Sequence, residues 1–449
     1  MFKKILIANR GEIAVRIVRA CRAMGIKTAV VYSTADKHSL PVYLADESVC
    51  IGPPPARDSY LNMNAIIQAA KGVGADAIHP GYGFLSENSG FAKLCQENGI
   101  TFIGPAPELI DRMGNKSQAR RTMIEAGVPV VPGTKNAVYT VEEALDAARE
   151  VGWPIMIKAS SGGGGKGMRI SRNEADFENA YQIAQRESAA AFGDNAMYLE
   201  RYMEGPRHIE VQIIGDTHGN VFALGERDCS VQRNHQKMIE ESPSPAVDEA
   251  TRAKLCETAV RAAKAVGYVS AGTVEFLMDA HREFYFMEMN TRIQVEHPVT
   301  EMVTGVDLIQ AMIRVAAGEV LDFNPEDVKV RGHAIECRIN AEQPAKNFLP
   351  SPGTISQMHL PGGNGVRVDT ATYDGLVISP YYDSLIAKII VHGRDRKEAI
   401  AKMRTALEEM VIVGVETNLD FQFTILENPT IKAGQADTGF IDLFMKGEV

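Results

Sequence analysis

The sequence predicts an α/β protein with α+β parts, and three observations support that fold class. The chain opens with a strand at residues 4–8, an amphipathic helix at 12–24 and a second strand at 27–32, a βαβ unit typical of parallel sheets. Farther along, two β-rich runs at 273–278 and 283–290 are separated by four polar residues, which predicts an antiparallel hairpin. Finally, 449 residues with 45% hydrophobic content indicate about three globular domains.

The composition argues against several classes of protein. With 47 basic and 57 acidic residues the net charge is -10, which disfavours a nucleic-acid surface but permits a local anion site. The six cysteines are scattered without a CxxC pair, so neither a disulfide framework nor a zinc site is indicated. Because the first apolar run is too short for a signal peptide and no stretch reaches membrane-spanning length, we expect a cytoplasmic protein without a membrane partner.

The N-terminal region continues to alternate strands and helices as far as residue 104. Its first turn, at residues 9–11, lacks GxGxxG, so a nicotinamide cofactor is weakly supported although Asp36 follows the second strand. A glycine-rich turn at 79–88, HPGYGFLSEN, carries Tyr82. This turn is either a tight loop or a ligand contact, and periodicity does not decide between them.

A second region opens near residue 115 with a helix, followed by the proline-rich segment 128–133, whose composition suits a hinge. Two short strands then flank the glycine run at 160–167, where Lys158 and Lys166 add positive charge. Consecutive glycines let backbone N–H groups approach an anion closely. The run is not a Walker A loop, because Gly167 stands where Ser or Thr should follow the lysine; the alternative is a flexible hairpin without a ligand.

The predicted hairpin carries candidate metal ligands. If Met278 faces Glu283, then Glu275 and Glu288 become diagonal neighbours on one face of the sheet, where their carboxylates can share a cation. Magnesium prefers oxygen ligands from one or two carboxylates, and Asn290 adds a third oxygen nearby. The alternative interpretation is an ordinary strand with its polar face in water.

Polar residues continue to alternate beyond the hairpin, which predicts one acid, amide and guanidinium face: Glu288, Asn290, Arg292, Gln294 and Glu296. Upstream, four residues are candidate phosphate or ribose partners: His208, Gln232, His235 and Lys237. A lone histidine is more often structural. Cys229 has no paired base in the sequence and is interpreted as a structural thiol.

The last region is predicted to be a third α+β unit. Strands are expected at 330–344, which carries Arg338, and at 385–393, and a helix follows from 396 to 410.

Six motifs then identify a resemblance that covers essentially the whole chain: NRGEIA (9–14), HPGYGFLSEN (79–88), KASSGGGGKGM (158–168), RDCSVQRNHQK (227–237), EMNTRIQVEHPVTE (288–301) and RGHAIECRINAE (331–342). In this order they resemble the biotin carboxylases of the ATP-grasp superfamily. The resemblance implies a Rossmann-like preATP-grasp N-terminal domain at 1–114, an ATP-grasp domain at 115–330 and a biotin carboxylase C-terminal domain at 331–449. It also implies a mobile glycine-rich lid at about 131–203.

The family activity implies a ligase that forms a carbon–nitrogen bond. Such an enzyme uses ATP, Mg²⁺ (or Mn²⁺) and bicarbonate to make carboxyphosphate, and then carboxylates biotin on a separate biotin carboxyl carrier protein. We expect the first half-reaction of acetyl-CoA carboxylase in fatty-acid synthesis, with carboxyltransferase subunits as partners. A homodimer is also expected, since Arg19 and Arg367 match the family, although Ala23 and Asn364 depart from it.

The resemblance also assigns roles to residues. ATP would be bound by Lys116, Lys158, Gly163, Gly164, Gly165, Lys166, Gly167, Glu200, Arg201, Met203, His208, Gln232, His235 and Leu277. Metal ligands would be Glu275, Glu288 and Asn290; bicarbonate would be held by Lys237, Arg292, Gln294, the Val295 backbone and Glu296; biotin would meet Tyr82 and Arg338. Glu296 would be the base, assisted catalytically by Arg338, Lys237 and Arg292. Arg201 and Met203 replace the family's frequent Lys and Leu.

Two other functions compete with this expectation. One is an ATP-grasp ligase that activates a different carboxylate with the same metal-binding glutamates. The other is a nucleotide-sensing protein that binds ATP without turnover. Since no Met-Lys-Met acceptor motif follows the third region, we expect that the chain itself is not biotinylated.

Overall fold

The computed structural model describes the chain except residues 160–167, 193–194, 322 and 325–326, and its backbone forms two compact units. The first unit contains residues 1–128, 207–277 and 288–449, and the second contains 129–206 and 278–287. The lid predicted at 131–203 lies inside the second unit. The predicted domain limits at residues 114 and 330 remain predictions.

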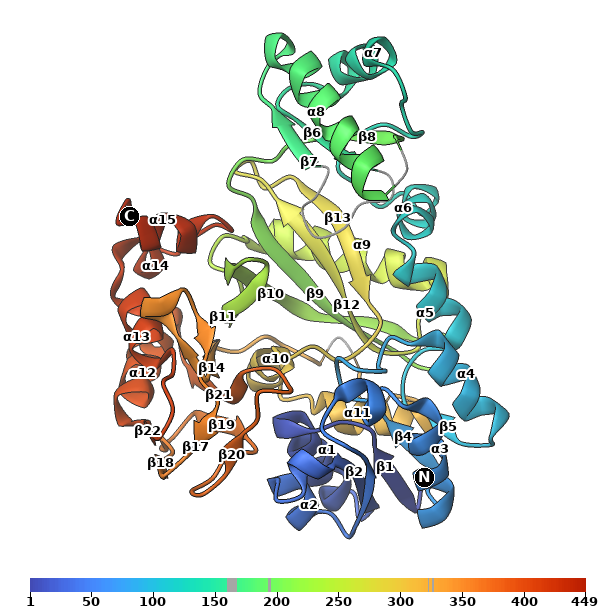
Figure 1. Ribbon diagram of the computed structural model, residues 1–449, viewed down its shortest axis with the longest axis vertical. Coiled ribbons are helices and arrows are strands. Elements are labelled where there is room, and N and C mark those ends of the chain that lie inside the picture. Colours follow the sequence, from blue (N-terminus) through green and yellow to red (C-terminus); the bar gives the residue numbers. More distant parts are fainter. Residues whose placement is uncertain (160–167, 193–194, 322, 325–326) are drawn as a thin grey trace. The chain divides into compact units, whose positions relative to one another are not determined.

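The N-terminal region is a five-stranded parallel sheet of order β3-β2-β1-β4-β5, shown in blue in Figure 1. Its strands are β1 (Lys4–Ile7), β2 (Lys27–Ser33), β3 (Glu47–Gly52), β4 (Ala77–His79) and β5 (Thr101–Phe102), and its helices are α1 (Gly11–Ala23), α2 (Leu40–Leu44), α3 (Met63–Val73), α4 (Ser89–Glu97) and α5 (Pro107–Gly114). The predicted βαβ unit is confirmed. The strand order reverses between β1 and β4, and ligands of such sheets bind where it does. Tyr82 follows β4 at this point.

Contacts within the chain already occupy Asp36, the residue that a dinucleotide ribose would need. Arg10 donates to both of its carboxylate oxygens at 2.7 and 2.8 Å, and the Tyr60 hydroxyl donates at 2.6 Å. The Arg10 guanidinium also lies 4.2 Å from the centre of the Tyr382 ring. These contacts agree with the weak sequence support for a nicotinamide cofactor.

The central and C-terminal regions share one sheet of order β13-β12-β9-β10-β11-β14-β21-β19. These strands are β9 (Arg207–Gly215), β10 (Val221–Arg233), β11 (Gln236–Ser242), β12 (Ser270–Met278), β13 (Phe284–Asn290), β14 (His333–Asn340), β19 (Val366–Thr370) and β21 (Leu385–Gly393). The predicted neighbours β12 and β13 are confirmed, while the register that places Glu275 diagonal to Glu288 remains a prediction. The long strands of the third region join the sheet of the central region, because β14 pairs antiparallel with β11, Ile239 lying opposite Cys337.

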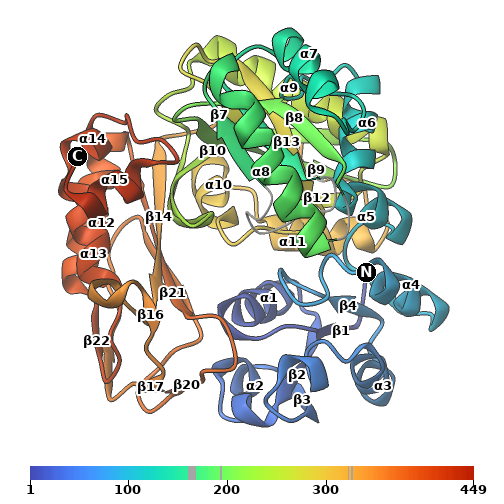
Figure 2. The same ribbon diagram turned by 45° about the horizontal axis from the view of Figure 1, so that its top comes forward.

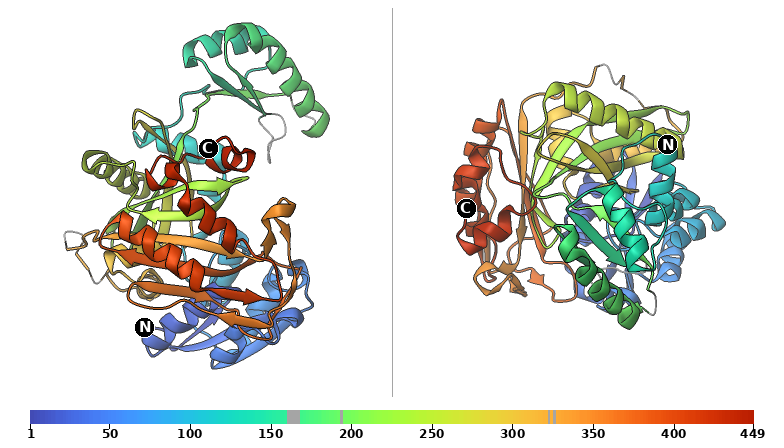
Figure 3. Two further views of the ribbon diagram at one scale, coloured as in Figure 1. Left: turned by 90° about the vertical axis from the view of Figure 1, so that its left-hand side faces the viewer. Right: turned by 90° about the horizontal axis from the view of Figure 1, so that it is seen from above.

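Alternation along β14 and β21 separates a core face from a site face. Ile335, Cys337 and Ile389 pack against α12 (Arg396–Glu409) in one buried cluster. The intervening residues face the other way, where α10 (His297–Thr304) packs. Three more helices of the C-terminal region are drawn in red in Figure 3 (left): α13 (Leu419–Glu427), α14 (Pro429–Lys432) and α15 (Phe440–Lys446).

The remaining elements of the first unit are helices and short strand pairs. The helices are α6 (Lys116–Glu125), α9 (Glu249–Val266) and α11 (Leu308–Ala316). The strand pairs are β15 (Glu342–Gln343) with β16 (Leu349–Pro350), β17 (Gly353–Thr354) with β20 (Val377–Ile378), and β18 (Gln357–His359) with β22 (Val411–Val413).

The second unit is a three-stranded sheet of order β7-β6-β8 covered on one face by two helices (Figure 2). The strands are β6 (Ile155–Ala159), β7 (Met168–Ser171) and β8 (Met197–Arg201), and the helices are α7 (Val141–Val151) and α8 (Glu174–Phe192). Phe177 and Tyr181 fill its core. The strands expected on either side of the glycine run are confirmed, with Lys158 opposite Met168. Of the helices that the structure describes, none combines the length and apolarity needed to cross a membrane.

Candidate active site

Lys237, near the start of β11, is surrounded by three carboxylates. Its Nζ lies 2.6 Å from Glu210 Oε2, 3.1 Å from Glu275 Oε1 and 2.6 Å from Glu296 Oε1. Burial alone would lower the pKa of this ammonium, but the three acids raise it well above its usual value. Lys237 is therefore a permanent cation at the centre of the site.

Glu275, on β12, is buried and held as a carboxylate. It accepts hydrogen bonds from Asn290 Nδ2 at 2.8 Å and Gln294 Nε2 at 3.0 Å, and His208 Nε2 lies 2.8 Å from its second oxygen. Burial opposes the charged form, but Lys237 and His208 outweigh it, so the pKa of Glu275 falls below its ordinary value. Four of the predicted site residues therefore meet around one carboxylate.

The carboxylate oxygens of Glu275 and its neighbour Glu288 fit a divalent cation. Glu288, half-buried on β13, has a raised pKa because burial and the negative charge of Glu275 both disfavour its carboxylate. Two acids that repel each other supply the hard oxygen ligands that Mg²⁺ or Mn²⁺ prefers, whereas Asn290 turns its amide nitrogen to Glu275 and its oxygen to Arg292. Within the described part of the chain, ligand atoms of His208, Glu210 and Glu275 also lie close enough to hold a metal. Glu210, however, already pairs with two cations.

Glu296 lies between two cations at the start of α10. Its fully buried side chain accepts from Lys237 Nζ at 2.6 Å and from Arg338 Nη2 at 2.8 Å. Burial and Glu210 raise its pKa, whereas Lys237 and Arg338 lower it, and the net shift is downward. Glu296 is thus an ionised carboxylate, the form that a general base requires.

Glu240 holds Arg338 from the neighbouring strand β11, a contact that the sequence did not predict. Arg338 donates from Nε to Glu240 Oε1 at 2.6 Å and from Nη2 at 2.5 Å. Burial raises the pKa of Glu240 to about 7, although Arg338 opposes that rise. Arg338 therefore bridges an acid of β11 and the buried Glu296.

Arg292 and Gln294 reach the site from irregular backbone, which corrects the expected alternating strand. β13 ends at Asn290, and α10 begins at His297. Glu87 of the 79–88 turn holds the intervening residues, accepting from the Thr291 backbone at 3.0 Å and from Arg292 Nε at 2.7 Å. Arg292 also donates to Asn290 Oδ1 at 3.1 Å and to Gln294.

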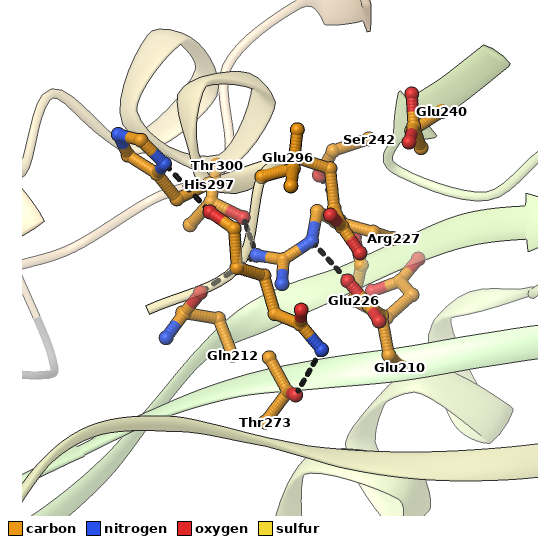
Figure 4. A network of polar contacts seen from close by, with 12 residues as sticks. Glu210, Gln212, Glu226, Arg227, Glu240, Ser242, Thr273, Glu296, His297 and Thr300 are labelled. Atoms are coloured by element: carbon orange, nitrogen blue, oxygen red, sulfur yellow. Dashed lines mark hydrogen bonds and ion pairs between the residues drawn. The ribbon is translucent and has the colours of Figure 1, made fainter. Parts of the chain in front are cut away.

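A fully buried arginine supports Glu210 (Figure 4). Arg227 donates to Glu210 Oε1 at 2.6 Å, to Gln212 at 2.7 Å and to the Thr300 hydroxyl at 2.8 Å. Since Glu210 uses its other oxygen for Lys237, the arginine fixes the acid that faces the central cation. The sequence alone did not identify this pair, because Glu210 and Arg227 come to face each other only when β9 pairs with β10.

Buried Cys229 is adjacent to this cluster. Its burial, together with the charge of Glu210, raises the pKa of the thiol well above its usual value. The group therefore stays a thiol, in agreement with its interpretation as a structural residue.

Two residues that sequence analysis missed form hydrogen bonds with Tyr82 and Val295. The Tyr82 hydroxyl donates to Glu12 of α1, and the Val295 carbonyl accepts from Lys388 Nζ at 2.7 Å. Glu12 belongs to the NRGEIA motif, which is the one signal that singled out its neighbourhood.

The predicted ATP residues divide between the two units. In the first unit, His208 and Gln232 are buried, Leu277 is half-buried, and Lys116 and His235 are exposed. The second unit contains Lys158, which pairs with Glu200, as well as Arg201 and Met203. The glycines Gly163, Gly164, Gly165 and Gly167, with Lys166, lie outside the described residues.

Family models match most of the chain. Residues 1–110 match the biotin carboxylase N-terminal domain, residues 115–324 match the ATP binding domain of the carbamoyl-phosphate synthase L chain, and residues 336–443 match the biotin carboxylase C-terminal domain.

Individual relatives match along their length. The chain is 56% identical to biotin carboxylase 1 of Bacillus subtilis over 445 residues, 99% of each chain. Among solved structures, it resembles the biotin carboxylase subunit of a pyruvate carboxylase with a TM-score of 0.91, 49% identity and coverage of 100% of this chain and 99% of that one. It also resembles the dimeric biotin carboxylase domain of 2-oxoglutarate carboxylase from Hydrogenobacter thermophilus, solved with MgADP, ADP and bicarbonate, with a TM-score of 0.90, 49% identity and coverage of 100% and 99%.

Proposed function

This chain belongs to the biotin carboxylase family, and on that premise we propose that it carboxylates biotin with bicarbonate and ATP through carboxyphosphate. One observation supports this most strongly: the buried, ionised Glu296 lies between Lys237 and Arg338. A carboxylate that two fixed cations hold ionised suits the deprotonation of a small anion, because Lys237 also attracts the anion and stabilises the charge that develops on it.

In the first half-reaction, Lys237, Arg292, Gln294 and the Val295 backbone hold bicarbonate, and Glu296 accepts its proton. The freed oxygen then attacks the γ-phosphorus of ATP, and ADP leaves. Glu275, Glu288 and Asn290 would hold Mg²⁺ or Mn²⁺, which neutralises phosphate charge when bound. A relative solved with MgADP and bicarbonate supports the use of a magnesium nucleotide and bicarbonate.

In the second half-reaction, carboxyphosphate yields CO₂ and phosphate, the phosphate accepts the proton of the biotin ureido nitrogen, and that nitrogen attacks the CO₂. Arg338 stabilises the negative charge on the ureido oxygen, and Tyr82 lines the biotin site. Glu240 fixes the guanidinium so that it is already oriented when the charge develops. This chain's own buried acids therefore determine where the arginine points.

We propose that the residues which the family resemblance assigns to ATP bind the nucleotide: Lys116, Lys158, Gly163, Gly164, Gly165, Lys166, Gly167, Glu200, Arg201, Met203, His208, Gln232, His235 and Leu277. Glycine-rich backbone and lysines suit the binding of phosphates.

The proposed partners are a separate biotin carboxyl carrier protein and carboxyltransferase subunits in the cytoplasm. We assign the chain to acetyl-CoA carboxylase and fatty-acid synthesis, although relatives that match along the whole chain carry pyruvate or 2-oxoglutarate carboxylase names. A homodimer is proposed on the face where Arg16, Arg19 and Arg367 line an open depression of about 360 Å³. The dimeric relative supports that assembly.

The proposal is tested by measuring ADP release from the purified chain with and without bicarbonate, and with and without free biotin. We expect ADP release that requires bicarbonate and rises with biotin. Release that is indifferent to bicarbonate would favour an ATP-grasp ligase for another carboxylate. Nucleotide binding without any release would favour the sensing protein.

A further inference from the structure

Lys388 is a fully buried lysine on β21 that the reaction described above does not use. Its Nζ lies 2.7 Å from the Val295 carbonyl oxygen, 3.1 Å from Glu12 Oε1 and 3.9 Å from Asp369 Oδ2. A lysine is almost never fully buried unless it is paired, because its charge loses hydration. These three contacts compensate for that loss.

The pairing of strands explains how the cation reaches this position. Lys388 lies directly opposite Arg338 on β14 and opposite Asp369 on β19, so the three side chains follow one line across the site face of the sheet. Burial would lower the pKa of Lys388, but Glu12, Glu336 and Asp369 raise it above the usual value. The lysine is therefore charged when it contacts Val295.

Two of the three contacts of Lys388 lead to an element that touches a substrate in the proposed reaction. The Val295 carbonyl belongs to the peptide that immediately precedes the base Glu296, on backbone that is neither helix nor strand. Glu12 in turn accepts from the hydroxyl of Tyr82, which lines the biotin site. The Lys388 ammonium thus connects the Val295–Glu296 backbone, assigned to bicarbonate, with Tyr82, assigned to the biotin site.

We propose that Lys388 is a positioning residue for bicarbonate and biotin, holding the Val295–Glu296 peptide through its carbonyl and Tyr82 through Glu12. This inference rests on the proposed function. Among the residues that the structure describes, Lys388 has no contact with those assigned to ATP. Its loss should therefore lower kcat/KM for bicarbonate and for biotin without changing KM for ATP. A purely structural residue would lower the amount of folded protein without changing the balance between substrates.

The test compares Lys388→Met with a matched variant, Lys402→Met. Lys402 also donates to a backbone carbonyl of the C-terminal region, that of His392 at 2.8 Å, but it lies on α12, which packs against the core face of β14 and β21. We expect Lys388→Met to reduce kcat/KM for bicarbonate by roughly ten- to a hundredfold and to reduce that for free biotin, with KM for ATP unchanged. Lys402→Met should leave all three values at the wild-type level.

A charge-balanced double variant separates positioning from charge compensation. Lys388→Met leaves Glu12 buried without its cation, and adding Glu12→Gln removes that charge. We expect the double variant to recover the thermal stability lost by the single variant while the bicarbonate defect remains, since the Val295 carbonyl still lacks its donor. If the single variant does not fold, this double variant is compared with Glu12→Gln alone.

Two results would overturn the inference: an unchanged kcat/KM for bicarbonate in folded Lys388→Met, or full recovery of that value in the double variant. A parallel rise in KM for ATP would also count against it. Failure of the proposed function itself is distinguishable, because the wild-type chain would then show no bicarbonate-dependent ADP release.

Discussion

At the scale of single residues, the site is a buried set of charges in which each acid has a different environment. Glu275 and Glu296 face Lys237 and are held ionised, whereas Glu240 has a pKa of about 7 and the pKa of Glu288 is raised by burial and by its neighbour. Environments that push the pKa values of neighbouring acids apart are typical of acid–base sites. They also make stability and activity depend on pH and on metal in predictable ways.

Glu240 should make the unfolding free energy depend on pH. Its pKa is about 7 in the folded chain, above the ordinary value of 4.5 that it regains on unfolding. As the pH rises between these two values, Glu240 loses its proton in the unfolded chain before it does so in the folded chain. The unfolding free energy of the wild-type chain therefore falls over this range. The unfolding free energy of Glu240→Gln should rise relative to wild type over this window by an amount on the order of 3 kcal/mol. Chemical denaturation at several pH values measures it; a constant difference would contradict the shifted pKa.

Glu288→Gln should impair catalysis more than nucleotide binding. Neutralising one acid weakens the proposed metal site, whereas the residues assigned to the base of the nucleotide are unchanged. We expect kcat to fall at least about tenfold at saturating Mg²⁺, with the Kd for ATP within a few-fold of wild type. Near-normal turnover at saturating Mg²⁺ would remove Glu288 from the metal role.

At the scale of elements, sequence patterns predicted several helices and strands but not the partners of the buried charges. The strand at Leu385–Gly393 was predicted at the observed limits, and the helix predicted from 396 to 410 is observed at Arg396–Glu409. The alternation through Glu296 was misleading, because Glu87 binds the Thr291 backbone and Pro298 lies in the first turn of α10, which end the strand. Contacts such as that of Glu240 with Arg338 depend on strands distant in sequence, so no local pattern reveals them.

The loop between β13 and α10 should depend on Glu87. Glu87→Ala removes the acceptor of both Thr291 N–H and Arg292 Nε, so the bicarbonate residues lose their support. We expect KM for bicarbonate to rise about five- to thirtyfold, with KM for ATP unchanged. Glu47→Ala is a suitable control, since Glu47 also pairs with a cation, Lys4 at 2.6 Å, on a strand of the N-terminal sheet. Equal effects of both variants would show a general loss of stability instead.

At the scale of the whole molecule, the first unit brings three regions of the chain to one site. The N-terminal region contributes Glu12, Tyr82 and Glu87. The central region contributes the site residues between Lys237 and Glu296, and the C-terminal strands contribute Arg338 and Lys388. The shared sheet accounts for this arrangement, since pairing of β11 with β14 sets Arg338 beside Glu240 and Glu296. The family resemblance predicted Tyr82, Lys237, Glu296 and Arg338 but not Glu12, Glu87 or Lys388; the strand pairing explains the orientation of Arg338.

The central claim is that Glu296 and Arg338 serve different half-reactions, and separate measurement of ADP and carboxybiotin tests it most directly. Arg338→Gln should strongly depress carboxybiotin formation while sparing much of the slow bicarbonate-dependent ADP release without biotin, because the lost charge acts on the ureido oxygen. Glu296→Gln should depress both products, because bicarbonate then loses its base. Equal loss of both products in Arg338→Gln would contradict this division of roles and would assign the arginine to bicarbonate activation or to the architecture of the site.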